Sequence, residues 1–198
     1  MAAAEAGADA IGLVLRPQSP RAVDVTLAAQ IREAIPPFVS LVVLLVNPQK
    51  EEVDAVIAEI IPDVLQFHGN ESEAFCSSFG LPFLKALGVR DEAELQTAML
   101  EYPSAQGLLL DRYDPERVGG TGEVFDWKQV PEESQQRLIV AGGLSADNVS
   151  AVITMLRPWA VDVSTGVESS PGRKVKDKMA HFCTAVHAAD AKIAATSV

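Results

Sequence analysis

The chain has 198 residues, of which 48% are hydrophobic, so it can bury one substantial core and its composition requires no second domain. A formal net charge of −11 argues against nucleic acid as a partner, and the longest apolar run, Leu41 to Val46, is too short to span a membrane. The first residues lack the basic start and apolar centre of a signal peptide, so we expect a cytoplasmic protein.

The first half of the chain alternates hydrophobic runs with segments of helical periodicity, after an opening helix tail at residues 2–6 that Gly7 ends. The runs favour strands, because a parallel strand that is buried on both faces is almost continuously apolar. The predicted strands are Ala10 to Leu15, Phe38 to Val46, Val64 to His68 and Phe83 to Val89. The predicted helices are Leu27 to Ile35, Glu51 to Ile61 and Glu71 to Phe79.

The second half continues this alternation. Its predicted strands are Leu108 to Leu110, Leu138 to Ala141 and Ala160 to Val163. Its predicted helices are Glu92 to Met99, a helix that Ser145 or Asp147 caps and that reaches Leu156, and Lys176 to Ala188. The connection from Arg112 to Asp126 is too long for a plain turn, and its segment Gly119, Gly120, Thr121 and Gly122 predicts a mobile loop over a site.

This order of elements indicates an α/β protein with a parallel sheet, because strands and helices alternate without a signal for an antiparallel hairpin. An open doubly wound sheet usually places its phosphate loop after the first strand, whereas the glycine turns come last here. We therefore predict a (β/α)8 TIM barrel. The sequence contains seven strands, and the helix tail at residues 2–6 has no strand before it. We expect residues 1–198 to form a single barrel domain that lacks the first strand and most of the first helix.

The turns that follow the last two strands, Gly142-Gly143 and Ser164-Thr165-Gly166, suit a phosphate group. Glycines let backbone N–H groups approach an anion, and such barrels commonly hold phosphate at their last two turns, beside a short extra helix. One turn alone is more often a tight connection, but two in series favour a phosphate site. The predicted ligand is a phosphorylated small molecule, held by the backbone of Gly142, Gly143, Ser164 and Gly166.

Several polar residues lie where predicted strands end, which is the mouth of the barrel. Period two places Gln66 and His68 on one face, and it places Asp162 and Ser164 together as well. Asp111 is the first polar residue after three leucines, and apolar walls favour the neutral form of a carboxyl group, which suits a general acid. Alternatively, Asp111 is a turn cap, and His68 only satisfies a loop carbonyl.

Few cations lie near the predicted mouth. Arg21 is one of them and can pair with a carboxylate of a substrate, although such a side chain is more often solvated. Lys85 lies in mid-strand, where an ion pair at the barrel floor is more common than a Schiff base. The chain has two cysteines, Cys76 and Cys183, both in predicted helices, so we expect them to pack rather than react.

The motifs along the chain are more specific together than singly. They are Ser19-Pro20-Arg21, Gln66-Phe67-His68-Gly69, Leu110-Asp111, Gly119-Gly120-Thr121-Gly122 with Phe125-Asp126-Trp127, Ala141-Gly142-Gly143-Leu144, and Val161 to Glu168. In this order and over nearly the whole chain, they resemble phosphoribosylanthranilate isomerase of tryptophan biosynthesis. The resemblance implies an Amadori rearrangement of an aminoaldose phosphate to an aminoketose phosphate, without a cofactor or a metal. It also implies Asp111 as general acid, Arg21 as a contact to anthranilate, Gln66, His68 and Asp162 as substrate contacts, and Gly119 to Gly122 as a lid.

The sequence departs from the family at the general base. The resemblance implies a cysteine in a Lys-Ile-Cys-Gly type motif at the end of the first strand, and the 198 residues contain no such motif. We therefore expect this chain to be inactive by itself, with an open barrel edge that can self-associate. Two alternatives remain open at this point, namely a phosphate-ligand-binding barrel remnant without catalysis, and an aminoaldose-phosphate isomerase of histidine biosynthesis.

Overall fold

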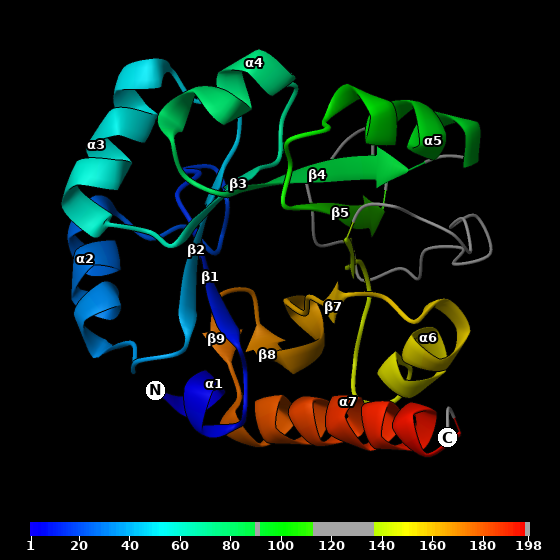
Figure 1. The fold of residues 1–198 in the computed structure, drawn as a ribbon. Coiled ribbons are helices and arrows are strands. Elements are labelled where there is room, and N and C mark those ends of the chain that lie inside the picture. Colours follow the sequence, from blue (N-terminus) through cyan, green and yellow to red (C-terminus); the bar gives the residue numbers. More distant parts are fainter. Residues whose placement is uncertain (90–91, 113–136, 197–198) are drawn as a thin grey trace.

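The computed structural model describes residues 1–89, 92–112 and 137–196. Its main element is a curved sheet of seven parallel strands that follow one another in chain order (Figure 1). The strands are β1 (Ala10–Val14), β2 (Ser40–Leu45), β3 (Val64–Phe67), β4 (Phe83–Val89), β5 (Gly107–Arg112), β6 (Leu138–Val140) and β7 (Ala160–Val161). The predicted number and order of strands are therefore confirmed, and the fold is an incomplete (β/α) barrel.

Helices cover the outer side of this sheet. They are α1 (Ala2–Glu5), α2 (Val25–Ala34), α3 (Lys50–Ile60), α4 (Glu73–Cys76), α5 (Glu92–Glu101), α6 (Val149–Leu156) and α7 (Lys176–Thr196), with the short 3₁₀ helices η1 (Ser77–Phe79) and η3 (Thr165–Val167). In the described part of the chain, no helix is both long enough and apolar enough to cross a membrane.

The two faces of the sheet carry separate hydrophobic clusters. The larger cluster lies between the sheet and the helices and includes Phe67, whose ring packs against the rings of Phe75, Phe79 and Phe83. Residues at the alternate positions face the other way and form a small inner cluster of Ala86, Leu109, Ala141 and Ile139. The inner face of the barrel is thus lined by few large side chains, and polar residues on that face stand close to its mouth.

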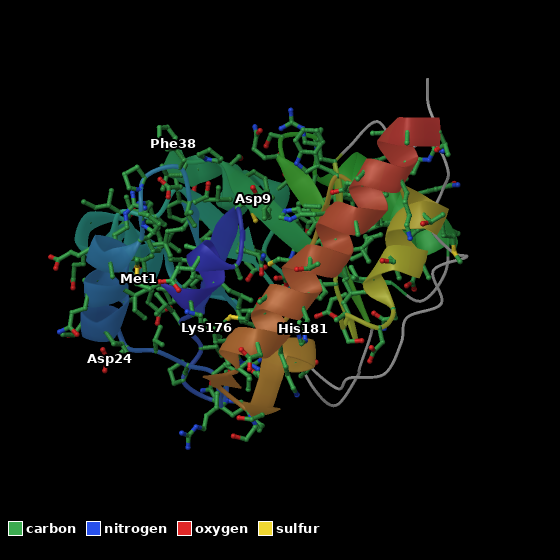
Figure 2. The ribbon with its side chains drawn as sticks, turned by 90° about the horizontal axis from the view of Figure 1, so that it is seen from below. Met1, Asp9, Asp24, Phe38, Lys176 and His181 are labelled. Atoms are coloured by element: carbon green, nitrogen blue, oxygen red, sulfur yellow. The ribbon has the colours of Figure 1, made fainter. Side chains whose placement is uncertain are left out.

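The sheet stays open between β7 and β1. Within the described residues, β2 is the only strand that pairs with β1 and β6 the only strand that pairs with β7, although Val14 of β1 also forms an isolated bridge with Ala22. Both edge strands are far more exposed than the strands between them. The last helix, α7, packs against both α6 and α1, which lie next to these two edges. Figure 2 shows α7 running beside α1, where Lys176 forms an ion pair with Glu5 at 2.8 Å. Helix α7 therefore connects the two ends of the open sheet.

Four local predictions need correction. Phe38 does not belong to β2 but is fully exposed before it, with a positive φ of 71°. Asn148, rather than Ser145 or Asp147, is the residue before α6, and the predicted helix from Glu71 is shorter and ends as η1. An antiparallel pair of short strands, β8 (Glu168–Ser170) and β9 (Arg173–Lys174), follows η3. Its polar residues carry no hydrophobic alternation, so the sequence pattern did not indicate it.

Candidate active site

Two carboxylates lie in one row at the mouth of the barrel. The pairing of Leu110 with Val140 and of Val140 with Val161 places Asp111, Ala141 and Asp162 at successive positions across β5, β6 and the end of β7. The hydrogen bond from the Asp162 N–H to the carbonyl of Val140 continues this row beyond β7. Because neighbouring strands lie about 4.8 Å apart, the backbones of the two aspartates are separated by roughly 10 Å. The two aspartates therefore lie on either side of Ala141 along the inner face of the sheet.

Asp162 has an unusual environment for an exposed carboxylate. It stands beside the open edge and is reached by water, yet the protein atoms around the inner face still disfavour its charge. This desolvation raises the pKa of Asp162, although the positive charge of Lys174 acts in the opposite direction. Asp162 is therefore protonated more readily than an ordinary surface aspartate.

Gln66 and His68 come from β3 and its carboxyl end, and they face away from Phe67 as period two predicts. Gln66 is buried. His68 is partly exposed as a residue, but its Nε2 atom is buried and has no hydrogen-bond partner among the described residues. Burial and then the charge of Lys85 lower the pKa of His68 to about 4. His68 is therefore a neutral imidazole at physiological pH, with one buried nitrogen available to a ligand.

The glycine turns have the backbone that the phosphate prediction requires. Gly142 and Gly143 adopt positive φ angles of 78° and 70°, which glycine tolerates best. A Cβ atom at Gly166 would lie 2.0 Å from the carbonyl oxygen of Leu144, so the two turns touch through their backbones. In the described part of the chain, the N–H groups of Gly142, Gly143 and Ser164 donate to no protein acceptor. These groups can bind an anion, and η3 supplies the predicted short helix beside them.

Arg21 is bound to a carboxylate of the protein itself. Its Nε and Nη2 atoms donate to Oε1 and Oε2 of Glu168 at 2.9 and 2.8 Å, and the two side chains are only 17% and 5% exposed. Lys174 also donates to Oε1 of Glu168, at 3.0 Å. Burial alone would raise the pKa of Glu168, but the hydrogen bonds from Arg21 and Lys174 outweigh it and lower this pKa to about 2. Glu168 is therefore fully ionised at physiological pH.

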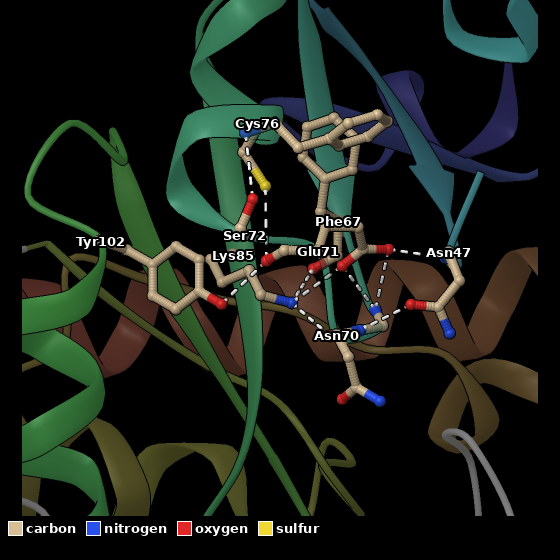
Figure 3. A network of polar contacts seen from close by, with 10 residues as sticks. Asn47, Phe67, Asn70, Glu71, Ser72, Cys76, Lys85 and Tyr102 are labelled. Atoms are coloured by element: carbon tan, nitrogen blue, oxygen red, sulfur yellow. Dashed lines mark hydrogen bonds and ion pairs between the residues drawn. The ribbon is translucent and has the colours of Figure 1, made fainter. Parts of the chain in front are cut away.

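A second buried ion pair supports the end of β3 (Figure 3). Lys85 donates to Glu71 at 3.0 Å and to the carbonyl of Gly69 at 2.5 Å, and both charged side chains are 2% exposed. Glu71 also accepts from the N–H groups of Gly69 and Asn47. The predicted ion pair of Lys85 is thus confirmed, but its position was wrong, because Lys85 faces the helices rather than the barrel floor. The network fixes the backbone directly after His68.

Neither cysteine is suited to act as a base. Cys76 is buried, its Sγ atom lies 3.9 Å from the carbonyl oxygen of Glu71, and burial raises its pKa to about 12. Cys183 lies on α7, and burial raises its pKa as well. Both thiols are protonated at physiological pH, which agrees with the prediction that they pack rather than react.

The predicted lid is the part of the site that the structure does not describe. The lid segment, Gly119, Gly120, Thr121 and Gly122, lies outside the described residues. Glu168 and Lys174 were not predicted as site residues, and Glu71 was not predicted as the partner of Lys85. Glu168 stood at the end of a quoted motif, but only folding brings it to Arg21, 147 positions earlier in the chain.

Comparison with known proteins agrees with this geometry. The sequence model of the family described as N-(5'phosphoribosyl)anthranilate (PRA) isomerase matches residues 1–185. A protein of Acidithiobacillus ferrooxidans named N-(5'-phosphoribosyl)anthranilate isomerase is 51% identical over 185 residues, which cover 93% of this chain and 90% of that protein. A protein of the same name from Cellvibrio japonicus is 47% identical over 192 residues, which cover 97% of this chain and 89% of that protein.

Solved structures show the same relationship. The phosphoribosyl anthranilate isomerase of Thermotoga maritima superimposes with a TM-score of 0.86 at 34% identity, over 94% of this chain and 92% of that one. A phosphoribosyl anthranilate isomerase in complex with reduced 1-(o-carboxyphenylamino)-1-deoxyribulose 5-phosphate gives a TM-score of 0.80 at 31% identity, over 94% and 91% of the two chains. A parallel barrel sheet with carboxylates and glycine turns at its mouth, together with these matches, shows that the chain belongs to the PRA isomerase family.

Proposed function

We propose that this chain serves the reaction for which its relatives are named, the isomerisation of N-(5'-phosphoribosyl)anthranilate to 1-(2-carboxyphenylamino)-1-deoxyribulose 5-phosphate in tryptophan biosynthesis. The observation that carries the proposal is the row of Asp111, Ala141 and Asp162, which leads directly into Gly142 and Gly143. A phosphate on the glycine turns places the sugar of the same ligand against both carboxylates.

Asp111 is the proposed general acid. It protonates the ring oxygen of the ribose as the bond from that oxygen to C1 breaks, which opens the ring and leaves an iminium ion, in which the anthranilate nitrogen keeps its hydrogen. A base then removes the proton from C2, and the electron pair of that bond neutralises the nitrogen and forms the enolamine, which tautomerises to the ketone by protonation at C1 and loss of the hydroxyl proton at C2. No cofactor takes part, because the carbon that is oxidised and the carbon that is reduced belong to the same molecule.

The other predicted residues bind the substrate in this proposal. The backbone of Gly142, Gly143, Ser164 and Gly166 binds the phosphate, and the sugar lies over Ala141 on the inner face, with Asp111 on one side and Asp162 on the other. Gln66 and His68 contact the substrate from β3, where the buried Nε2 atom of His68 has its hydrogen-bonding capacity still open. Arg21 meets the anthranilate carboxylate, and the segment Gly119 to Gly122 is the proposed lid.

These residues do not supply the general base that removes the proton from C2. The family resemblance assigns it to a cysteine in a Lys-Ile-Cys-Gly type motif, and both cysteines of this chain lie in other places with raised pKa values. We therefore propose that residues 1–198 bind the substrate but turn it over poorly. This property also defines the second candidate function, a barrel that binds the phosphorylated ligand without catalysis.

An activity assay with an added strand tests this proposal. The 198-residue chain, the same chain extended by a strand that ends in Lys-Ile-Cys-Gly, and an extended chain with Ala for that Cys are assayed for conversion of N-(5'-phosphoribosyl)anthranilate. We expect turnover from the cysteine-bearing chain alone. Appreciable turnover by the unextended chain would show that another residue is the base, and inactivity of all three would leave the binding function as the better account.

Two further predictions accompany this function. An enzyme of amino-acid biosynthesis is expected in the cytoplasm. The edges of β1 and β7 that pair with no other strand in the described part of the chain favour self-association, since open sheet edges pair readily with other strands.

A further inference from the structure

Glu168 links two parts of the candidate site that lie far apart in the chain. Its carboxylate binds the guanidinium of Arg21, in the loop after β1, through two hydrogen bonds. The same carboxylate binds Lys174 on β9 and accepts from the N–H of Gly172 at 3.2 Å. Lys174 in turn donates to the backbone carbonyl and the hydroxyl of Ser164, at 2.9 and 3.2 Å. The buried carboxylate of Glu168 therefore connects the loop of Arg21, through Lys174, to the glycine turn that starts at Ser164.

The geometry leaves part of the Arg21 guanidinium for a ligand. A guanidinium carries five N–H donors in a rigid plane, and Glu168 uses one on Nε and one on Nη2. Among the described residues, Nη1 has no protein acceptor. The outer edge of the guanidinium therefore keeps a second pair of parallel donors, which matches a second carboxylate.

The charges around Glu168 do not cancel. Arg21 and Lys174 bind its side chain, and Lys178 donates to its backbone carbonyl at 2.7 Å. Two cations thus bind the carboxylate of Glu168 and a third binds the backbone of the same residue, in a chain whose formal net charge is −11. These groups keep a positive charge beside Arg21 that suits an anionic ligand.

We propose that Glu168 is a positioning residue for substrate recognition. It orients the free edge of Arg21 toward the anthranilate carboxylate, whereas Lys174 binds the Ser164 turn through contacts of its own. This inference rests on the proposed function, because it takes the carboxylate of that substrate as the group recognised. Glu168 itself does not touch this group.

Two other roles for Glu168 predict different behaviour. If Glu168 only reduces the local positive charge, its neutralisation should strengthen the binding of any anionic ligand. If Glu168 only stabilises the β8–β9 pair, its replacement should lower thermal stability and weaken all ligands alike. If Glu168 positions Arg21, its replacement should weaken the binding of ligands that carry the carboxylate more than the binding of ligands that lack it.

The test compares two ligands by calorimetry. One is reduced 1-(o-carboxyphenylamino)-1-deoxyribulose 5-phosphate, and the other is the same compound with a phenylamino group, which lacks the carboxylate. We expect Glu168→Gln to weaken the first ligand by about tenfold, the effect of one lost charge-assisted contact, and to change the second by much less. Glu168→Asp keeps the charge but shortens the side chain, so we expect the same selective loss, and this variant serves if Glu168→Gln does not fold.

The matched control is Glu5→Gln, which removes the carboxylate of the exposed ion pair with Lys176 and should leave both affinities unchanged. Equal weakening of the two ligands by the Glu168 variants, or tighter binding, would overturn the positioning role. If the unchanged protein binds neither ligand, the proposed function itself fails, and this result is distinct from a failure of the Glu168 inference alone.

Discussion

His68 brings an imidazole to the mouth of the barrel in a form that resists protonation. Its pKa is lowered from 6.5 to about 4, so between these values the unfolded chain binds a proton that the folded chain does not. The free energy of unfolding should therefore fall as the pH drops from 6.5 to 4, by about 3 kcal/mol from this residue, and be little affected by it well above pH 6.5. The variant His68→Gln should lose this part of the pH dependence.

Urea unfolding of both proteins at pH 7, 5.5 and 4.5 measures this effect. His181→Gln, a change at an exposed position of α7, serves as the control and should keep the pH dependence of the unchanged protein. Parallel curves for the unchanged protein and His68→Gln would contradict the assignment of the titration to His68.

Asp111 supports a prediction about chemistry rather than stability. In the cysteine-bearing extended chain, Asp111→Asn should reduce turnover by a factor of about 10² to 10⁴, because the amide keeps the shape but cannot supply the proton. Affinity for the reduced product analogue should hardly change. The control is Asp54→Asn in the exposed pair with Lys50, which should retain full turnover. Turnover of Asp111→Asn close to that of the unchanged protein would remove Asp111 from the mechanism.

At the scale of elements, the ion pair of Lys85 and Glu71 connects β4 with the carboxyl end of β3. Both side chains are almost fully buried, so removing one partner leaves an unpaired charge in the interior. We expect Lys85→Met to lower the free energy of unfolding by about 3 to 5 kcal/mol. The double change Lys85→Met with Glu71→Leu should cost clearly less, because no lone charge remains.

Chemical denaturation of the single and double variants checks this expectation. Lys50→Met, in the exposed pair with Asp54, is the matched control and should change stability by about 0.5 kcal/mol or less. A double variant that is less stable than Lys85→Met would show that the pair stabilises the fold through contacts other than charge compensation.

The elements differ in how well the sequence predicts them. The parallel strands were predictable because continuous apolar runs are a local signal, and β4 has the predicted bounds from Phe83 to Val89. The pair of β8 and β9 was not, since its strands are short and polar, and Glu168 contacts Lys174 within the pair and the distant Arg21 outside it. Phe38 was assigned to a strand because of its apolar character, and only its backbone conformation excludes it.

At the scale of the whole molecule, a site residue could be predicted only where the barrel architecture alone brings it to the mouth. Strand ends meet at one mouth in any parallel barrel, so Asp111, Asp162 and the glycine turns could be grouped from their places after strands. Glu168, which Arg21 contacts, could not be grouped with it, because no periodicity relates residues that are 147 positions apart. Likewise, alternation placed Lys85 inside a strand but did not say whether its side chain faced the barrel or the helices.

The most direct test of the account is a crystal structure of the chain with reduced 1-(o-carboxyphenylamino)-1-deoxyribulose 5-phosphate, since binding does not require the general base. We predict the phosphate within hydrogen-bond distance of the N–H groups of Gly142, Gly143 and Ser164, and the carboxylate of the ligand at Arg21. The sugar carbons should lie between Asp111 and Asp162. A ligand bound elsewhere, or a phosphate turned away from the glycine turns, would contradict the proposed active site.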